Sequence, residues 1–200
     1  MFPPPASRAS LTIPNLITLV RIFLTPVFII FITRGQYRHA LAVFLLAGVS
    51  DLADGLIARL WQQRSPLGTY LDPLADKLLL SSTFLTLGIY HQIPAWLTAL
   101  VLSRDITLAL GALVLKLTDY PLVIRPSLAG KWTTTLQIAC VLLVLIKNSW
   151  GLPPYLLGAW FILTGSLTAA SGAHYIAGGL KLVAQGPNHR SPEGPHGRNH

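Results

Sequence analysis

Four aspartates gather in one short part of a chain that is otherwise poor in acid. Four of the seven acidic residues lie between positions 51 and 76, with apolar sequence on both sides. Asp51 and Asp54 are three residues apart and Asp72 and Asp76 are four apart, so each pair lies on one face of a helix. Ionisable groups beside apolar helices are costly and mark functional sites in membrane proteins. This acidic segment is therefore the first candidate for chemistry.

Four carboxylates could form structural ion pairs, relay protons or hold divalent cations. Arg59, Arg64 and Lys77 are close enough in sequence to serve as ion-pair partners. A proton path spreads its carboxylates along the membrane depth, whereas these gather around one loop. Mg²⁺ and Mn²⁺ prefer carboxylate oxygens together with substrate phosphates. We favour two such ions, which balance the four negative charges and can clamp both oxygens of a phosphoryl displacement.

Small residues accompany the acidic faces. Gly55, Ala58 and Gly68 leave room there, and a glycine lets a phosphate or a nucleotide approach the helix backbone closely. A single glycine in a membrane helix is more often a packing contact, so the combination carries the argument. Asp72 precedes Pro73, and this pair also fits a helix N-cap followed by proline at the first helical position. Both roles stay open for Asp72.

The composition predicts an all-α, polytopic integral membrane protein. Of the 200 residues, 52% are hydrophobic and 11% are charged, against about 25% charged in soluble domains. About 20 apolar residues cross a bilayer as a helix. Six transmembrane helices are predicted, at Leu16–Thr33, Ala40–Leu60, Leu71–Tyr90, Ala95–Leu117, Leu128–Ile146 and Tyr155–Val183. Cys140 lies in the fifth stretch and is predicted to be a buried structural thiol.

The basic residues predict the orientation. We divide the chain into a cytoplasmic N-terminal segment, 1–12, a membrane domain, 13–185, and a disordered polar tail, 186–200. With both termini in the cytoplasm, ten Lys and Arg flank the cytoplasmic side and three flank the other, as the positive-inside rule requires. The acidic segment then faces the cytoplasm.

The net charge of +8 suits anionic lipid, and the absence of a basic stripe with interleaved aromatics excludes nucleic acid as a partner.

Three further basic residues lie in or beside the apolar stretches, namely Arg21, Arg104 and Lys131. An unpaired charge inside a span is costly, and a phosphate on an acceptor molecule would give Arg a bidentate partner. Asp105 points about 100° away from Arg104 on a helix, so we expect no simple pair between the two. The structural alternative for Arg104 is a bond to one of the four aspartates of the acidic segment.

The acidic segment resembles a known signature. Its eight fixed positions, Asp51-x2-Asp54-Gly55-x2-Ala58-Arg59-x8-Gly68-x3-Asp72-x3-Asp76, resemble the CDP-alcohol phosphotransferase motif in every defined position. The similarity runs from Ile13 to about Ile146. The stretch 14–21, together with Arg104-Asp105 and Gly130-Lys131, resembles the phosphatidylglycerophosphate synthase and cardiolipin synthase branch of that family.

The resemblance implies a six-helix enzyme of a bacterial inner membrane, usually a homodimer, that uses CDP-diacylglycerol. An acceptor hydroxyl attacks the phosphorus joined to diacylglycerol, and CMP leaves. Asp76 is the family's candidate general base. Residue by residue, the two metal ions are assigned to Asp51, Asp54, Asp72 and Asp76. The CDP site is assigned to Gly55, Ala58, Arg59 and Gly68. Arg21, Arg104 and Lys131 are expected to bind the acceptor phosphate.

Two departures from the family pattern bear on the acceptor. Users of glycerol-3-phosphate resemble one another in a second Arg eight residues after Arg104, where this chain has Ala112, and often in a Lys where it has Thr133. Both changes remove positive charge near a phosphomonoester dianion. CMP-forming cardiolipin synthases also lack that Arg, and their acceptor phosphatidylglycerol is a singly charged phosphodiester. Short bacterial chains with this N-terminal pattern most often make phosphatidylglycerophosphate, so we expect glycerol-3-phosphate first and phosphatidylglycerol second. A transporter or a non-enzymatic lipid-binding relative is a distant alternative.

Overall fold

The computed structural model describes residues 13–61, 66–117, 128–153 and 155–184. Within these ranges, side chains are described except at 13–17, 52–61, 66–74, 112, 115–117, 128–129, 156 and 180–184. The predicted terminal segments, 1–12 and 186–200, lie outside the described residues.

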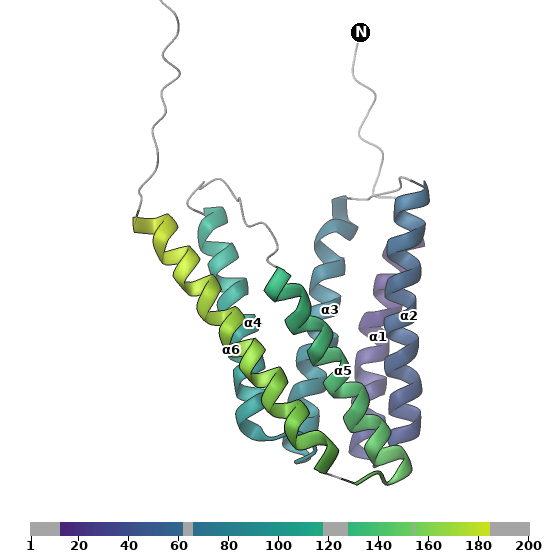
Figure 1. Ribbon diagram of the computed structural model, residues 1–200. Helices are drawn as coiled ribbons and strands as arrows, with labels where there is room; N and C mark the ends of the chain where they lie inside the picture. Colours follow the sequence, from purple (N-terminus) through teal and green to yellow (C-terminus); the bar gives the residue numbers. More distant parts are fainter. Residues whose placement is uncertain (1–12, 62–65, 118–127, 154, 185–200) are drawn as a thin grey trace, which may run out of the picture.

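The described chain is all-α and contains six long helices (Figure 1). They are α1 (Ile13–Thr33), α2 (Tyr37–Trp61), α3 (Pro66–Ile89), α4 (Ala95–Leu117), α5 (Leu128–Trp150) and α6 (Tyr155–Ala184). Each predicted apolar stretch corresponds to one helix, with bounds that differ by a few residues. The prediction of an all-α fold with six helices is therefore confirmed.

Three of the helices end in a left-handed residue at the same end of the bundle (Figure 1). Gly35 follows α1 with φ 68°, and its N–H donates to the carbonyl of Ile32 at 2.9 Å. Gly151 follows α5 with φ 67°, and His91 follows α3 with φ 54°. Glycine adopts this conformation without a steric cost and is the usual residue after a helix C-terminus. These stops lie just after the first, third and fifth predicted apolar stretches.

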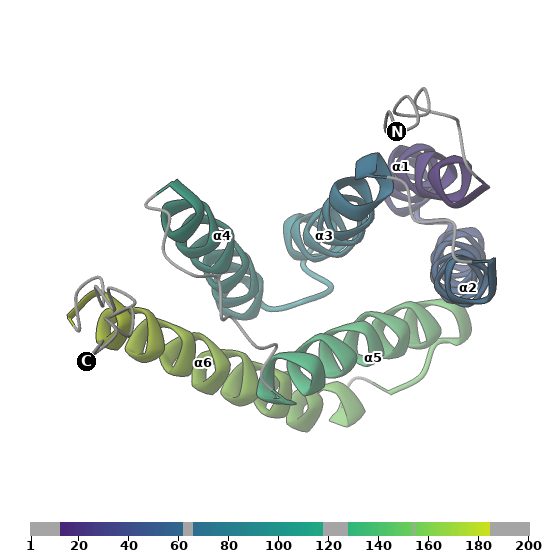
Figure 2. The same cartoon turned by 90° about the horizontal axis from the view of Figure 1, so that it is seen from above.

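The helices form a closed circuit. Helix α1 contacts α2 and α3, α3 contacts α4, α4 contacts α6, α6 contacts α5, and α5 contacts α2. Seen from above, α4, α3 and α1 form one row and α6 and α5 form another, with α2 joining the two rows at one side (Figure 2). Helices α3 and α5 also touch across the circuit. Charged side chains that point inward from different helices can therefore meet.

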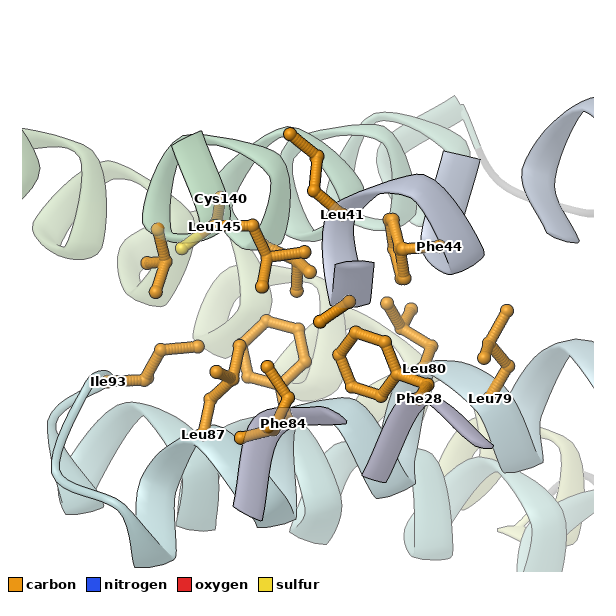
Figure 3. Close-up of a cluster of buried hydrophobic side chains, with 14 of the residues drawn as sticks. Phe28, Leu41, Phe44, Leu79, Leu80, Phe84, Leu87, Ile93, Cys140 and Leu145 are labelled. Carbon is orange, nitrogen blue, oxygen red and sulfur yellow. The ribbon is translucent and has the colours of Figure 1, made fainter. Parts of the chain in front are cut away.

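The apolar core lies in the half of the bundle nearest the three left-handed turns. It joins side chains from all six helices, including Phe28, Phe44, Phe84, Val101, Leu145 and Leu157. Figure 3 shows part of this cluster, with Cys140 among the buried side chains. The Cys140 thiol is free and buried, as predicted.

The same buried faces turn polar in the other half of the bundle. Along α1 the buried stripe reads Thr18, Arg21 and Thr25 before it continues into Phe28 and Ile32. Along α4 the order is reversed with the chain direction, from Leu97 and Val101 to Arg104 and Asp105. Apolar packing thus fixes one half of the bundle and leaves the buried charges together in the other half.

Replacing Phe28 by Ala should destabilise this core by about 3 kcal/mol or more, because the ring is fully buried and its loss leaves a cavity. The measurement is thermal or denaturant unfolding of the purified chain in detergent. The matched control is Phe23→Ala on the same helix, where the ring is 70% exposed, and it should change stability by a few tenths of that amount at most. Equal losses in the two variants would contradict the placement of the core.

Of the helices in the described part of the chain, one is long and apolar enough to cross a membrane by length and composition. It runs from Gly130 to Trp150, and Thr18–Thr33 is a shorter apolar helix. The crossing of a membrane by all six helices remains a prediction.

Candidate active site

The first and last aspartates of the acidic segment meet at one arginine. The Nη2 atom of Arg21 lies 2.6 Å from Oδ1 of Asp51, and its Nη1 donates to Oδ1 of Asp76 at 2.6 Å. The guanidinium side chain is 1% exposed, whereas the two carboxylate side chains are 43% and 52% exposed. Arg21 therefore lies beneath two carboxylates that remain open to the outside.

Helix α1 brings these groups together because it packs against both α2 and α3. Arg21 belongs to the buried stripe of α1, and the hydroxyl of Thr25, one turn later, donates to the Arg21 carbonyl at 3.1 Å. Asp51 belongs to α2 and Asp76 to α3, so the two carboxylates are carried by different helices. Their convergence is therefore a property of the three-helix packing.

The other motif residues lie in the same two helices, but their side chains fall outside the described residues. Asp54, Gly55, Ala58 and Arg59 continue α2 beyond Asp51, and Gly68 and Asp72 precede Asp76 in α3. Helical spacing places Asp54 on the face of Asp51 and Asp72 on the face of Asp76. Their metal and CDP roles remain predictions.

The donor chemistry at this point fits a divalent cation. Carboxylate oxygens are the ligands that Mg²⁺ and Mn²⁺ prefer. The oxygens of Asp51 and Asp76 already converge on positive charge, supplied here by the Arg21 guanidinium. Among the described residues, no three His, Cys, Asp or Glu side chains lie close enough to hold a metal, and Asp54 and Asp72 are not in that set. A complete metal site would need those two residues.

A second group of charges lies between α3 and α4. Oδ1 of Asp105 accepts hydrogen bonds from Nζ of Lys77 at 2.6 Å and from Nη1 of Arg104 at 2.8 Å. Arg104 and Asp105 are buried, while the Lys77 side chain is 44% exposed. Within the described part of the chain, Nε of Arg104 and Oδ2 of Asp105 have no hydrogen-bond partner. We call these three residues the Asp105 cluster.

The pair between Arg104 and Asp105 corrects the sequence prediction, which expected no bond between these neighbours. The prediction was wrong because it compared the directions of the Cβ atoms only. An Arg side chain is long enough to turn toward the next residue. A buried charge is costly unless it is paired, so burial favours this ion pair. The alternative, a bond from Arg104 to an aspartate of the acidic segment, does not occur among the described side chains.

Close packing holds α4 in place beside α3 and α6. A Cβ atom at Gly88 of α3 would lie 2.6 Å from the Thr98 hydroxyl, and one at Gly165 of α6 would lie 2.4 Å from the Trp96 ring. A larger residue at either position would force the contacted side chain to shift. Further along α6, a Cβ atom at Gly172 would lie 3.7 Å from the Arg104 side chain. Arg104 and Asp105 are therefore carried by a helix that packs closely against both of its neighbours.

The remaining predicted acceptor residue, Lys131, is exposed on α5. No hydrogen bond or ion pair in the described structure joins it to Arg21 or Arg104. Thr133, which stands where related chains often carry Lys, is buried, and its hydroxyl donates to the Leu167 carbonyl on α6 at 3.4 Å. The three predicted acceptor cations thus have different surroundings: Arg21 pairs with Asp51 and Asp76, Arg104 belongs to the Asp105 cluster, and Lys131 is exposed on α5.

Residues 11–171 match the family model described as CDP-alcohol phosphatidyltransferase. The chain belongs to the CDP-alcohol phosphatidyltransferase family. This match covers α1 to α5 and much of α6, including both groups of charges. The recognition of the family from the acidic segment is confirmed.

Curated relatives fall into two named groups. A probable CMP-forming cardiolipin synthase of Drosophila melanogaster is 34% identical over 83% of this chain and 57% of its own length, and the CMP-forming cardiolipin synthase of Homo sapiens is 36% identical over 90% and 67%. A probable phosphatidylglycerophosphate synthase of Mycobacterium tuberculosis is 32% identical over 89% and 87%. The chain thus spans 57% of the length of the fly relative and 67% of the length of the human one.

Two site residues were not predicted from the sequence, Lys77 and Asp105. Each carried a visible signal. Lys77 directly follows the last aspartate of the motif, and Asp105 is an acid inside an apolar stretch, where an ionisable group needs a partner. That argument would have paired Asp105 with Arg104 in the same stretch, but it does not point to Lys77 on another helix.

Proposed function

We propose that this chain transfers the phosphatidyl group from CDP-diacylglycerol to a glycerol-type acceptor and releases CMP. The single observation that carries the proposal is the convergence of Asp51 and Asp76 at one point, within a complete eight-position motif of the family. Glycerol-3-phosphate is the first proposed acceptor, in keeping with the relative named phosphatidylglycerophosphate synthase that this chain matches over 87% of that relative's length.

The chain's own residues supply the proton transfer and the positioning. Asp76, which is half-exposed, takes the proton of the acceptor hydroxyl as that oxygen bonds to the phosphorus. The bond from that phosphorus to the oxygen of CMP breaks, and CMP leaves with the electron pair. Arg21 fixes one oxygen of Asp76 and one of Asp51, so the base and a metal ligand keep a common orientation.

Two divalent ions, Mg²⁺ or Mn²⁺, would be held by Asp51, Asp54, Asp72 and Asp76 and would stabilise the charge that develops on the phosphate oxygens. Gly55, Ala58, Arg59 and Gly68 would line the CDP site on the same two helices, with Arg59 near the phosphates.

A bilayer is the proposed environment, and two features of the surface support it. Every described helix exposes large apolar side chains, more than a soluble monomer normally shows; examples are Phe23, Leu46, Leu85, Ile106, Leu143 and Ile162. Exposed aromatic residues lie near both ends of the bundle, with Trp96, Trp150 and Tyr155 at one end and Trp132 toward the other, as at membrane interfaces. We propose six membrane spans, a bacterial inner membrane, a cytoplasmic active site and a homodimer.

Phosphatidylglycerol is the second candidate acceptor, which would make the chain a CMP-forming cardiolipin synthase. Two observations favour it. Two relatives with 34% and 36% identity carry that name. In addition, Asp105 takes up much of the positive charge of Arg104 and Lys77, and Thr133 is a buried helix contact, so less charge is available for a dianion.

The proposal predicts CMP release from CDP-diacylglycerol that depends on both an acceptor and a divalent cation. Purified chain in detergent should release CMP with Mg²⁺ or Mn²⁺ and lose at least about 99% of this activity in EDTA, because the clustered carboxylates then lack their cations. Activity should return when the cation is restored in excess. Thin-layer analysis of the lipid formed from each acceptor identifies the product. Failure to release CMP with glycerol-3-phosphate, phosphatidylglycerol, inositol phosphate or serine would overturn the proposal.

A further inference from the structure

Asp105 is a buried acid outside the eight-position motif, and it binds cations from two helices. Its Oδ1 accepts a hydrogen bond from Lys77 of α3 and another from Arg104 of α4. Its other oxygen, Oδ2, has no hydrogen-bond partner among the described residues. A carboxylate that was needed only to join two helices would normally have both of its buried oxygens satisfied.

One residue of the cluster and the predicted base are consecutive residues of α3. Lys77 directly follows Asp76, whose carboxylate meets Arg21 and Asp51. The Lys77 side chain is 44% exposed, so an anion from outside can approach the cluster at this cation. Arg104 is buried and its Nε has no partner among the described residues, so Arg104 contributes its positive charge to the cluster while Lys77 is the cation open to the outside.

The formal charges of the cluster are two positive and one negative, which leaves a net charge of +1. Arg21 adds little to this balance, because two carboxylates already surround it. A singly charged phosphodiester matches +1, whereas a phosphomonoester dianion brings a second negative charge toward the Asp105 carboxylate. One unit charge several ångströms away in a partly solvated site changes relative binding by about tenfold.

We propose that Asp105 is a specificity-determining residue, which lowers the charge offered by Lys77 and Arg104 and so limits the preference of the acceptor site for dianions over singly charged phosphates. This inference rests on the proposed function, because it takes the cluster as part of the acceptor site. Asp105 does not touch the reacting atoms in this role; it acts through its two partners.

The test compares two small anions as competitive inhibitors against whichever acceptor supports CMP release. Methyl phosphate is a dianion at pH 8, since the second pKa of a phosphomonoester is about 6, and dimethyl phosphate carries one charge. For Asp105→Asn, the inhibition constant of methyl phosphate should fall about tenfold relative to that of dimethyl phosphate. Asp105→Glu keeps the charge and should keep the wild-type ratio. Lys77→Gln, which removes one positive charge, should move the ratio in the opposite direction.

The ratio separates a charge effect from a structural one. A variant that merely packs poorly would weaken both inhibitors together or lower the turnover number without changing the ratio, and either result would overturn the inference. An unchanged ratio in both Asp105→Asn and Lys77→Gln would do the same. Absence of CMP release from the wild-type chain with every acceptor would instead contradict the proposed function.

Discussion

Replacing Asp76 by Asn is expected to lower CMP release about a thousandfold while CDP-diacylglycerol still binds. Asparagine keeps the size of the side chain but cannot take a proton, and loss of a positioned general base costs about 10²- to 10⁴-fold. The carboxylate of Asp51 cannot act as the base in its place, because Asp51 lies on another helix. It is also held by a different nitrogen of the Arg21 guanidinium, Nη2. Turnover is measured as CMP release, and binding as retention of labelled CDP-diacylglycerol by the purified variant.

Two companion variants make this result specific. Asp51→Asn removes a predicted metal ligand but not the base, so excess Mg²⁺ or Mn²⁺ should restore part of its activity and none of that of Asp76→Asn. Asp119→Asn is the same substitution outside the motif and outside the described residues, and it should behave like the wild type. If Asp76→Asn kept substantial activity at any metal concentration, Asp76 would not be the base.

Much of the fold could be predicted from the sequence because the signals are local. An apolar stretch of about 20 residues sets the length of a helix, and Gly35 and Gly151 stop α1 and α5 in a conformation that glycine adopts without strain. The family motif was equally accessible, because its eight positions lie within two consecutive helices. None of these predictions required knowledge of which helices touch.

Contacts between distant helices could not be predicted in the same way. Arg21 is far from both Asp51 and Asp76 in the sequence, and only the packing of α1 against α2 and α3 brings the three together. The sequence therefore suggested a phosphate as the partner of Arg21, whereas the described partners are two aspartates. The Arg104–Asp105 pair was excluded on backbone direction, although side-chain reach and a shared second cation, Lys77, decide it.

Arg21 leads to the second large expected effect, which is on stability. In Arg21→Gln, the carboxylates of Asp51 and Asp76 lose the cation between them, and two like charges are left near each other. We expect the free energy of unfolding in EDTA to fall by about 2 kcal/mol. Removing one partner of a fully buried pair costs about 3–5 kcal/mol, and these carboxylates are 43% and 52% exposed, so water compensates in part.

Divalent cations should offset this loss of stability. In the wild type, an incoming Mg²⁺ or Mn²⁺ must share Asp51 and Asp76 with the guanidinium or displace it, whereas in Arg21→Gln it meets uncompensated carboxylates. The rise in melting temperature on adding the cation should therefore be larger for Arg21→Gln than for the wild type. Thermal unfolding in detergent, with EDTA and with each cation, measures both quantities.

The control for this experiment is Arg34→Gln, the same change at an exposed arginine in the turn after α1, which should alter neither the stability in EDTA nor the gain from the cation. The experiment also separates the two roles of Arg21. If Arg21 serves only the acceptor phosphate, as the sequence suggested, Arg21→Gln will raise the acceptor KM and leave the stability in EDTA unchanged. If Arg21 holds the two aspartates in place, the stability will fall and the gain from the cation will grow, because the cation then supplies the charge that the guanidinium provided.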